Sequence, residues 1–170
     1  MLKDHRKEAP DHVSCAVITV SDTRNKETDK SGKLIIELLE KAGHRISFYE
    51  IVKDDRQSIE QTIRKATENE NVEAVLMNGG TGISKRDVTI ETIEPMFDKQ
   101  LDGFGELFRY LSYELDIGSA SMLSRATAGV IHNRIVFATP GSSGAVKLAM
   151  EKLILPELGH VVRELKKDLE

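Results

Sequence analysis

The chain has 170 residues, 39% of them hydrophobic and 31% charged, with a formal net charge of −4. These values are typical of one globular domain, and the negative charge disfavours nucleic acid or a membrane surface as the main partner, because both attract excess Lys and Arg. Residues 1–12 are polar and lack the apolar core of a signal peptide or membrane anchor. We therefore expect a flexible N-terminal tail over residues 1–12 and a single domain over residues 13–170.

Cysteine and histidine offer little disulfide or zinc chemistry. Cys15 is the only cysteine and lies in an apolar run, where a thiol usually packs as a small hydrophobic group. A single cysteine excludes disulfides within the chain, which is compatible with a reducing cytoplasm, where we expect the protein to be located. The five histidines are scattered without helical ligand spacing, so a zinc site is not expected.

The first predicted elements are a strand and a helix. Residues 13–20 form a nearly continuous apolar run rich in β-branched residues, as in a strand that is covered on both faces. Apolar residues at helical spacing from Leu34 to Leu39 then predict a helix, and Gly43 is placed to end it.

The same alternation continues in the next segment. A second strand is predicted at about 46–52, and Ser58 is expected to cap a helix over about 59–68, ahead of a third strand at 74–77. Strands that alternate with helices over short links form a parallel sheet, and right-handed crossovers place all three strand ends on one edge.

Polar residues follow each of these three strands. Ligands of open parallel sheets bind beyond the carboxyl ends of the strands, so this convergence favours a ligand site over turns alone. The clusters are Ser21-Asp22, Asp54-Asp55 and the segment from Gly79 to Asp87.

The third cluster begins with the glycine loop Gly79-Gly80-Thr81-Gly82. Glycines adopt positive φ and let ligand oxygens approach backbone N–H groups, which suits a phosphate cradle. Glycine-rich strand exits also occur where a chain only turns, so these four residues alone leave both readings open. The loop is neither a Walker A motif nor a dinucleotide fingerprint, since no Gly-Lys-Ser/Thr follows and Lys85 occupies the position of the third glycine.

Helical patterns continue beyond the glycine loop. Thr89 is predicted to cap a short helix, and a longer amphipathic helix follows Gly103. Glu106 and Arg109 lie three residues apart on the longer helix and can pair with each other. Its apolar stripe is either core or a subunit contact, and it consists of Phe104, Leu107, Phe108, Leu111 and Leu115.

The C-terminal part begins with two predicted strands, 127–131 and 135–139, joined by a tight turn. A turn this tight joins antiparallel strands, so the sheet is expected to be mixed. The turn Pro140–Gly144 then precedes a helix and suits an anion, although Ser142 or Ser143 can equally serve only as an N-cap. Residues 145–169 are predicted to be helical, with a break or bend at Pro156.

Glycine amides and acidic clusters at one edge suit a nucleotide polyphosphate with Mg²⁺, which needs only one or two carboxylates besides phosphate and water. Asp54 and Asp87 are the candidate ligands, with turn and cap roles as the alternative. No cysteine and no Ser-His-Asp arrangement can be assigned to this region, so a covalent enzyme intermediate is not expected. Group transfer by positioning and electrostatic stabilisation fits better.

Six short motifs occur in a fixed order between about Val13 and Leu158. They are Ser21-Asp22; Lys53-Asp54-Asp55; Gly79-Gly80-Thr81-Gly82 with Arg86-Asp87-Val88-Thr89; Gly103-Phe104-Gly105-Glu106 with Arg109; Ser124-Arg125; and Pro140-Gly141-Ser142. Each is weak alone, but together and in register they resemble the MoaB/Mog family of molybdopterin-binding proteins. The resemblance implies a three-layer α/β/α fold with a mostly parallel, mixed central sheet. It also implies a homotrimer or a hexamer of trimers, and a part in molybdenum or tungsten cofactor assembly.

Active members of that family adenylylate molybdopterin with Mg²⁺ and ATP and release pyrophosphate. By position, the resemblance makes Asp54 and Asp87 the catalytic and magnesium-binding aspartates. Lys53 and Ser143 depart from the family pattern, since proline is common at both positions. The resemblance assigns the following residues to nucleotide and substrate binding: Ser21, Asp22, Gly79, Gly80, Thr81, Gly82, Glu106, Arg109, Ser124, Arg125, Pro140, Gly141, Ser142 and Ser143.

The expected reaction is attack of the terminal phosphate of molybdopterin on the α-phosphorus of ATP. No general base is required, because a phosphate monoester is already anionic at neutral pH. Arg109, Arg125 or Lys85 is expected to supply positive charge. The alternatives are a non-catalytic carrier or scaffold that hands molybdopterin to the metal-insertion protein of the pathway, and recruitment of the fold to metal insertion itself.

Overall fold

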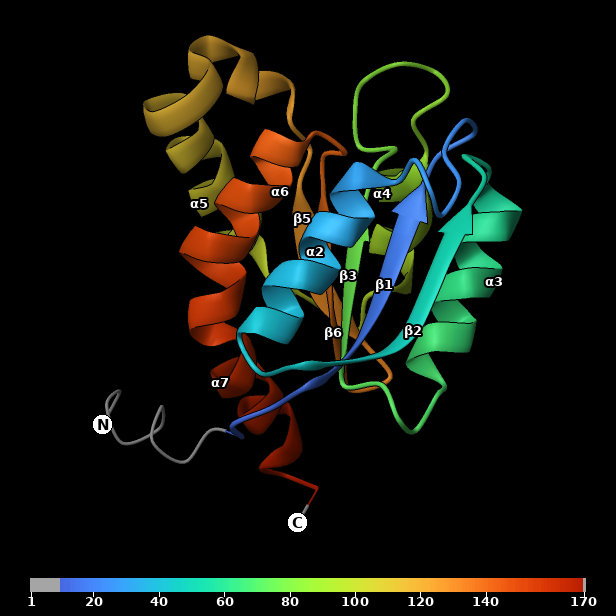
Figure 1. The fold of residues 1–170 in the computed structure, drawn as a ribbon, viewed down its shortest axis with the longest axis vertical. Helices are drawn as coiled ribbons and strands as arrows, with labels where there is room; N and C mark the ends of the chain where they lie inside the picture. Colours follow the sequence, from blue (N-terminus) through green and yellow to red (C-terminus); the bar gives the residue numbers. More distant parts are fainter. Residues whose placement is uncertain (1–9, 170) are drawn as a thin grey trace.

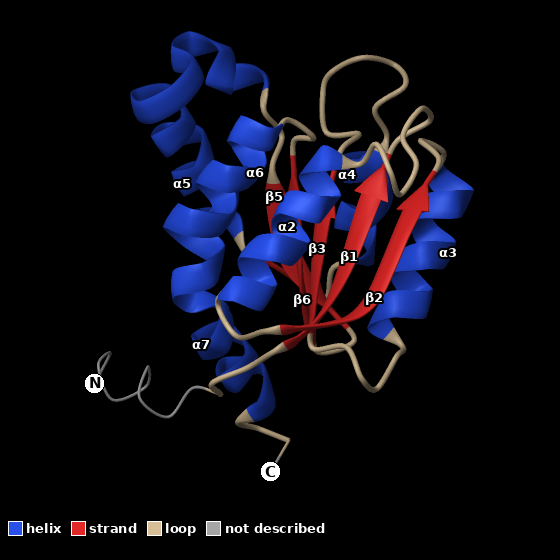
Figure 2. Cartoon of the chain, in the orientation of Figure 1, coloured by secondary structure: helices blue, strands red, loops and turns tan. Residues whose placement is uncertain are grey.

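The computed structural model describes residues 10–169, so residues 1–9 of the predicted tail lie outside the described part. A six-stranded sheet in the order β2-β1-β3-β6-β5-β4 runs through the molecule (Figures 1 and 2). β1, β2, β3 and β6 are parallel to one another, whereas β5 is antiparallel to both β6 and β4. The mostly parallel, mixed sheet is therefore confirmed. The strands are β1 (Ser14–Val20), β2 (Arg45–Val52), β3 (Ala74–Asn78), β4 (Lys99–Gln100), β5 (Thr127–Ile131) and β6 (Arg134–Thr139).

Helices cover both faces of the sheet (Figure 2). One face packs against α2 (Lys30–Lys41), α5 (Asp102–Ser112), α6 (Ser143–Ala149) and α7 (Leu155–Lys166), and the other against α3 (Arg56–Thr67) and α4 (Thr89–Ile93). Short helical segments η1 (Glu94–Met96), η2 (Tyr113–Ile117), η3 (Gly118–Leu123) and η4 (Met150–Ile154) connect them. The result is the three-layer α/β/α architecture that the motifs implied.

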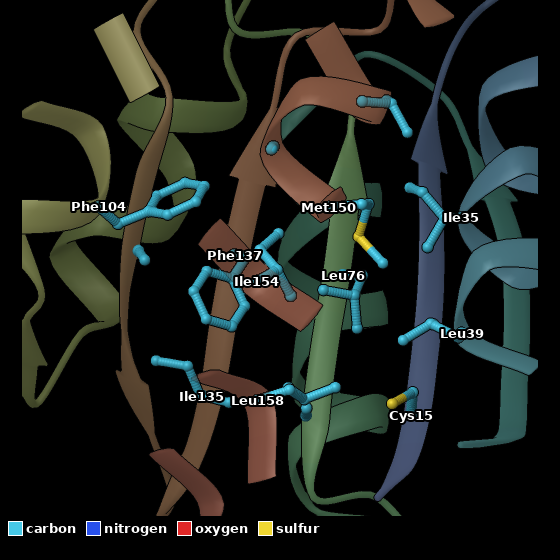
Figure 3. Close-up of a cluster of buried hydrophobic side chains, with 14 of the residues drawn as sticks. Cys15, Ile35, Leu39, Leu76, Phe104, Ile135, Phe137, Met150, Ile154 and Leu158 are labelled. Carbon is cyan, nitrogen blue, oxygen red and sulfur yellow. The ribbon is translucent and has the colours of Figure 1, made fainter. Parts of the chain in front are cut away.

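Alternation along β1 builds two separate cores. Cys15 and Val17 point to one face and pack with α2, α6 and α7, as Figure 3 shows for Cys15, Ile35 and Met150. Ala16 and Ile18 point to the other face and pack with α3 and α4. Because both faces are buried, the strand reads as a continuous apolar run instead of alternating with polar residues.

Two predicted helix caps are wrong. α3 begins at Arg56, and its N-cap is Asp55, whose side chain accepts a hydrogen bond from the Ser58 N–H. Thr89 lies inside α4 and its hydroxyl donates to the Gly79 carbonyl at 3.0 Å, so it fastens the glycine loop to the helix. The cap of α3 lies at a neighbouring polar residue, whereas the N-cap of α4 is the apolar Val88, which makes no side-chain cap hydrogen bond.

Three other local expectations have clear outcomes. Gly43 follows the end of α2 with φ +89°, and Ser142 is the N-cap of α6. Pro156 does not break the C-terminal helix, because the π-helical turn η4 precedes it and α7 continues from Leu155. Within residues 10–169, no helix has both the length and the apolar character needed to cross a membrane.

The stripe on α5 divides into core and surface. Phe104 and Phe108 are buried, and the Phe104 ring meets Phe137 edge-on at 5.0 Å between centroids. Leu107 and Leu115 are more than half exposed. The core alternative is therefore confirmed for Phe104 and Phe108, whereas Leu107 and Leu115 lie on the surface of this chain.

Candidate functional site

The loops that follow β1, β2, β3 and β6 meet at one edge of the sheet, at the top of Figure 1. β2 lies on one side of β1 and β3 on the other, so the connections diverge here, which is where open α/β sheets bind ligands. A cleft of about 560 Å³, the central cleft, opens at this point. Its lining includes Ser21, Asp22, Asp54, Gly79, Asp87 and Gly141 from the predicted site, together with Arg24, Ser84, Lys85 and Arg86.

Asp54 is the least compensated carboxylate of the central cleft. Its Oδ1 atom is buried and accepts no hydrogen bond from the described part of the chain. Burial and the nearby charges of Asp87 and Asp22 raise the pKa of Asp54, although a hydrogen bond from the Val88 N–H and the charge of Arg86 act in the opposite direction. A carboxylate in this setting favours a positive charge beside it.

Asp87 lies in the loop that covers the same cleft. Its carboxylate accepts hydrogen bonds from the Ser84 hydroxyl at 2.6 Å and the Ser84 N–H at 3.2 Å, which shape the loop. A Cβ atom on Gly82 would lie 2.6 Å from Asp87 Oδ2, so a side chain there would displace the Asp87 carboxylate. The turn role considered for Asp87 is thus present, and it leaves the carboxylate on the cleft wall.

The glycine loop presents N–H groups that the protein does not use. Its carbonyls at Gly80, Thr81 and Gly82 accept hydrogen bonds from the Thr89 N–H and from Arg125. No hydrogen bond within residues 10–169 engages the N–H groups of Gly80, Thr81 or Gly82. Unpaired amides on a loop with positive φ at Gly79 and Gly80 are a feature of anion cradles.

Four predicted site residues lie elsewhere. Glu106, Arg109, Ser124 and Arg125 line a second cleft of about 480 Å³ between α5 and the start of β5. Arg109 donates to the Ala126 carbonyl at 3.1 Å, and no ion pair joins it to Glu106 among the described residues. Arg125 forms an ion pair with Glu91 and donates hydrogen bonds to the carbonyls of Thr81 and Gly82 in the glycine loop. In the single chain, the two arginines therefore do not supply the charge of the central cleft.

The turn after β6 contributes one residue to the central cleft. Gly141 lines it, and a Cβ atom there would contact Gly79 Cα at 3.4 Å. Ser142 caps α6 by accepting from the Ala145 N–H at 3.2 Å, and neither Pro140 nor Ser143 lines the central cleft. The cap role of Ser142 is confirmed, and neither Pro140 nor Ser143 makes a hydrogen bond with the cleft residues in the described chain.

Sequence reasoning missed Arg24, which lies between the Ser21-Asp22 cluster and α2. Its guanidinium donates to Ser31 Oγ at 2.9 Å and to the Gly141 carbonyl at 3.3 Å. The available signal was Asp29, which is the N-cap of α2 and lies 3.8 Å from Arg24. Because one of its anchors, the Gly141 carbonyl, lies 117 residues away in the chain, no local sequence pattern marks Arg24 as a cleft residue.

The central cleft fits a magnesium ion bound in the manner of nucleotide sites. Among the described residues, no group of three or more acidic, histidine or cysteine side chains forms a metal site of its own. Mg²⁺ does not need one, because two carboxylates suffice when phosphate and water oxygens complete the shell. The unpaired Asp54 Oδ1, beside a glycine loop where a Cβ on Gly80 would approach it to 2.8 Å, matches that requirement.

Together, the fold and the cleft define a class: a doubly wound α/β protein with an acidic, glycine-bearing site at the switch point of its sheet. Residues 16–160 match the family described as "Probable molybdopterin binding domain". The chain belongs to this family, within its MoaB/Mog branch.

Relatives of known sequence and structure agree with this assignment. The chain is 64% identical to Molybdenum cofactor biosynthesis protein B of Bacillus subtilis (strain 168), over 98% of both proteins. A crystal structure of a Molybdenum cofactor biosynthesis protein B shares 59% identity and superposes with a TM-score of 0.92, covering 94% of this chain and 99% of that one. The tungsten cofactor synthesizing protein MoaB from Pyrococcus furiosus shares 43% identity with a TM-score of 0.83, covering 94% and 100%.

Proposed function

We propose that this protein acts in the biosynthesis of the molybdenum or tungsten cofactor, as a Mg²⁺- and ATP-dependent molybdopterin adenylyltransferase. Family membership and relatives named for these two cofactors support the pathway. The observation that carries the activity is the Asp54 carboxylate, which is buried and unpaired at one oxygen, lines a cleft with Asp87, and lies beside the glycine loop with its unused amides.

In the proposed reaction, a terminal phosphate oxygen of molybdopterin attacks the α-phosphorus of ATP. One P–O bond forms, and the bond from the α-phosphorus to the bridging oxygen breaks, with its electron pair leaving in pyrophosphate. Asp54 and Asp87 would hold the metal ion, which when bound supplies positive charge to the phosphates. The N–H groups of Gly80, Thr81 and Gly82 would orient phosphate oxygens, and the loop over residues 81–88 would limit water access.

Pyrophosphate release from purified molybdopterin and ATP tests this activity directly. Asp54→Asn and Asp87→Asn each keep the side-chain shape and should lower turnover about 100-fold or more, because the charge that holds the metal is lost. Asp55→Asn is the matched control, since Asp55 adjoins Asp54 and acts as an N-cap, a role that asparagine fills equally well.

The alternative, a carrier or scaffold without catalysis, predicts a different pattern in the same assay. A carrier releases no pyrophosphate with either wild type or variants, yet still binds molybdopterin. Pyrophosphate release that requires molybdate would favour the metal-insertion step. Normal release by Asp54→Asn would contradict the proposed role of that residue.

We further propose that the protein assembles as a trimer, or a hexamer of trimers, through the surface of α5, η2 and η3. This surface exposes a run of large apolar side chains, each between 47% and 78% exposed. Isolated exposed apolar residues are ordinary, but a contiguous group marks an interaction surface. The group, termed the α5 surface, comprises Leu107, Tyr110, Tyr113, Leu115, Ile117, Met122 and Leu123.

A further inference from the structure

We propose that Arg24 binds phosphate oxygens of the substrate in the central cleft, as the one anchored cation of that cleft among the residues that the structure describes. The inference rests on the proposed function for the identity of the substrates. The chemistry itself is more general, because a guanidinium at the wall of such a cleft recognises any phosphate or phosphoanhydride oxyanion.

The anchor of Arg24 begins with a buried carboxylate. Asp29 is fully buried, which is rare for a charged residue unless its charge is satisfied. Its oxygens accept hydrogen bonds from Thr19 Oγ1 at 2.7 Å, the Tyr49 hydroxyl at 2.6 Å and the Gly32 N–H at 3.0 Å. Arg24 Nη1 lies 3.8 Å away. Asp29 is thus a negative charge fixed beside the guanidinium of the cleft residue Arg24.

Two further contacts tie Arg24 to the opposite wall. Ser31 Oγ accepts from Arg24 Nη1, and both Ser31 and Arg24 donate to the Gly141 carbonyl. Gly141 in turn packs against Gly79, at the start of the glycine loop. The guanidinium therefore has a defined position relative to the loop that offers the unpaired amides.

Arg24 keeps donors for a ligand. A guanidinium carries five N–H groups. The hydrogen bonds to Ser31 and Gly141 use two of them, and the side chain lines the central cleft while remaining 34% exposed. The remaining N–H groups are available to an anion beside Asp54 and the glycine loop.

The other cations of the cleft are not anchored in this way. Lys85 and Arg86 are exposed in the loop over residues 81–88, and neither makes a hydrogen bond or short ion pair within the described chain. Binding an anion would require them to become ordered, with an entropic penalty that a preorganised group avoids. With Asp22, Asp54 and Asp87 on the same walls, a fixed positive charge is what an anionic ligand needs there.

The test measures binding of inorganic pyrophosphate in the presence of Mg²⁺ by titration calorimetry, which does not depend on turnover. Arg24→Gln should weaken binding at least about tenfold, and Arg24→Lys by a smaller factor, because lysine keeps the charge but not the fork of donors. Lys26→Gln is the matched control: it removes one charge from the same loop, and Lys26 does not line the central cleft. Its affinity should stay within about twofold of wild type.

Several results would overturn the proposal: wild-type affinity in Arg24→Gln, an equal loss in Lys26→Gln, or no pyrophosphate binding by the wild type. If Arg24→Gln does not fold, as judged by its melting transition, the affinity of Arg24→Lys for pyrophosphate serves as the test instead. A wild type that binds pyrophosphate through Arg24 but forms none from ATP and molybdopterin would contradict the adenylylation alone. A rise in KM for ATP or for molybdopterin in Arg24→Lys identifies which substrate's phosphate Arg24 contacts.

Discussion

The pKa values of the adjacent residues Asp54 and Asp55, which follow β2, are shifted in opposite directions. Burial and the charges of Asp87 and Asp22 raise the pKa of Asp54, whereas hydrogen bonds from Ser58 lower the pKa of the exposed Asp55. Asp55 stabilises the fold as a helix cap. Asp54 is held in an environment that disfavours its charge, which is a feature of functional carboxylates.

Replacing Asp54 with asparagine should therefore stabilise the protein at neutral pH. Because the folded-state pKa lies above the unfolded value, the ionised group disfavours folding above the folded pKa, and this penalty fades as pH falls toward the unfolded value. Asp54→Asn should raise Tm by about 2 °C at pH 7 and by less at pH 4. Thermal scans at both pH values measure this, with Asp55→Asn as a control near wild type.

A drop in Tm for Asp54→Asn at pH 7 would show that Asp54 stabilises the fold as a charged group. Added Mg²⁺ provides an independent check. It should raise Tm of the wild type and not of the variant, since binding to the native state alone is stabilising.

His44 at the opposite edge of the sheet has the reverse sensitivity. Its Nδ1 atom accepts a hydrogen bond from the Val13 N–H at 3.0 Å, which requires a neutral ring. Burial and the charge of His12 lower its pKa below 6.5. The unfolded chain then binds the proton first as pH falls, so stability decreases below about pH 6.5 until the folded pKa is passed.

The variant His44→Asn cannot titrate in this range. The fall in Tm between pH 7.5 and 5.5 should be smaller in His44→Asn than in the wild type, by on the order of 1–2 °C. Parallel pH profiles of the two proteins would contradict this role for His44.

At the scale of elements, the loop after β3 depends on backbone conformation as much as on chemistry. Gly79 has φ +94°, and a Cβ atom there would lie 2.2 Å from the Val20 carbonyl oxygen. Thr89 and Arg125 hold the carbonyls of the loop from two sides. The first residues of the loop are therefore held by hydrogen bonds to α4 and to Arg125.

A comparison of two glycines separates strain from steric clash. Gly43 has nearly the same φ, +89°, with no atom within 4 Å of an added Cβ. Gly43→Ala should lower the free energy of unfolding by about 1 kcal/mol, the left-handed penalty alone. Gly79→Ala should lower it by about 3 kcal/mol or more, because the clash is with backbone. Denaturant titrations measure both, and equal losses would contradict the steric argument.

At the scale of the whole molecule, the exposed apolar groups are concentrated on one side. The second cleft, which contains Arg109 and Arg125, borders the α5 surface and shares Met122 with it. Assembly through this surface would bring a neighbouring chain close to these arginines. The four predicted site residues that lie away from the central cleft would then be near a subunit boundary.

The double variant Leu107→Glu with Tyr110→Glu tests the proposed assembly. Both side chains are more than half exposed, so the substitutions should leave the fold intact while placing charges in the contact. Light scattering after size exclusion should show a trimer or hexamer for wild type and a monomer for the variant. Leu169→Glu, an equally exposed apolar site at the C-terminal end, should leave the oligomer unchanged. An unchanged mass in the double variant would place the contact elsewhere.

Much of the fold was readable from local patterns, because each depends on residues close in the chain. Three features are determined by residues close together in the chain. They are the apolar run of β1, the end of α2 at Gly43, and the two-residue hairpin turn at His132 and Asn133, both with positive φ. The acidic and glycine clusters could be placed on one edge from topology alone, since parallel strands share the direction of their ends. The sequence by itself thus determined the architecture, the edge and the pairing of Asp54 with Asp87 in one cleft.

Only the tertiary structure decided how the charged groups are distributed. Arg125 donates to a carbonyl of the glycine loop, and Arg109 donates to the Ala126 carbonyl. Arg24, by contrast, is anchored at the central cleft by contacts with Asp29, Ser31 and Gly141. The physical reason is that a long cationic side chain donates hydrogen bonds to the buried carbonyl and carboxylate oxygens that the fold places within its reach. Most of those acceptors lie well away along the chain, 117 residues for the Gly141 carbonyl that Arg24 contacts and 44 residues for the Thr81 carbonyl that Arg125 contacts, so no local pattern records them.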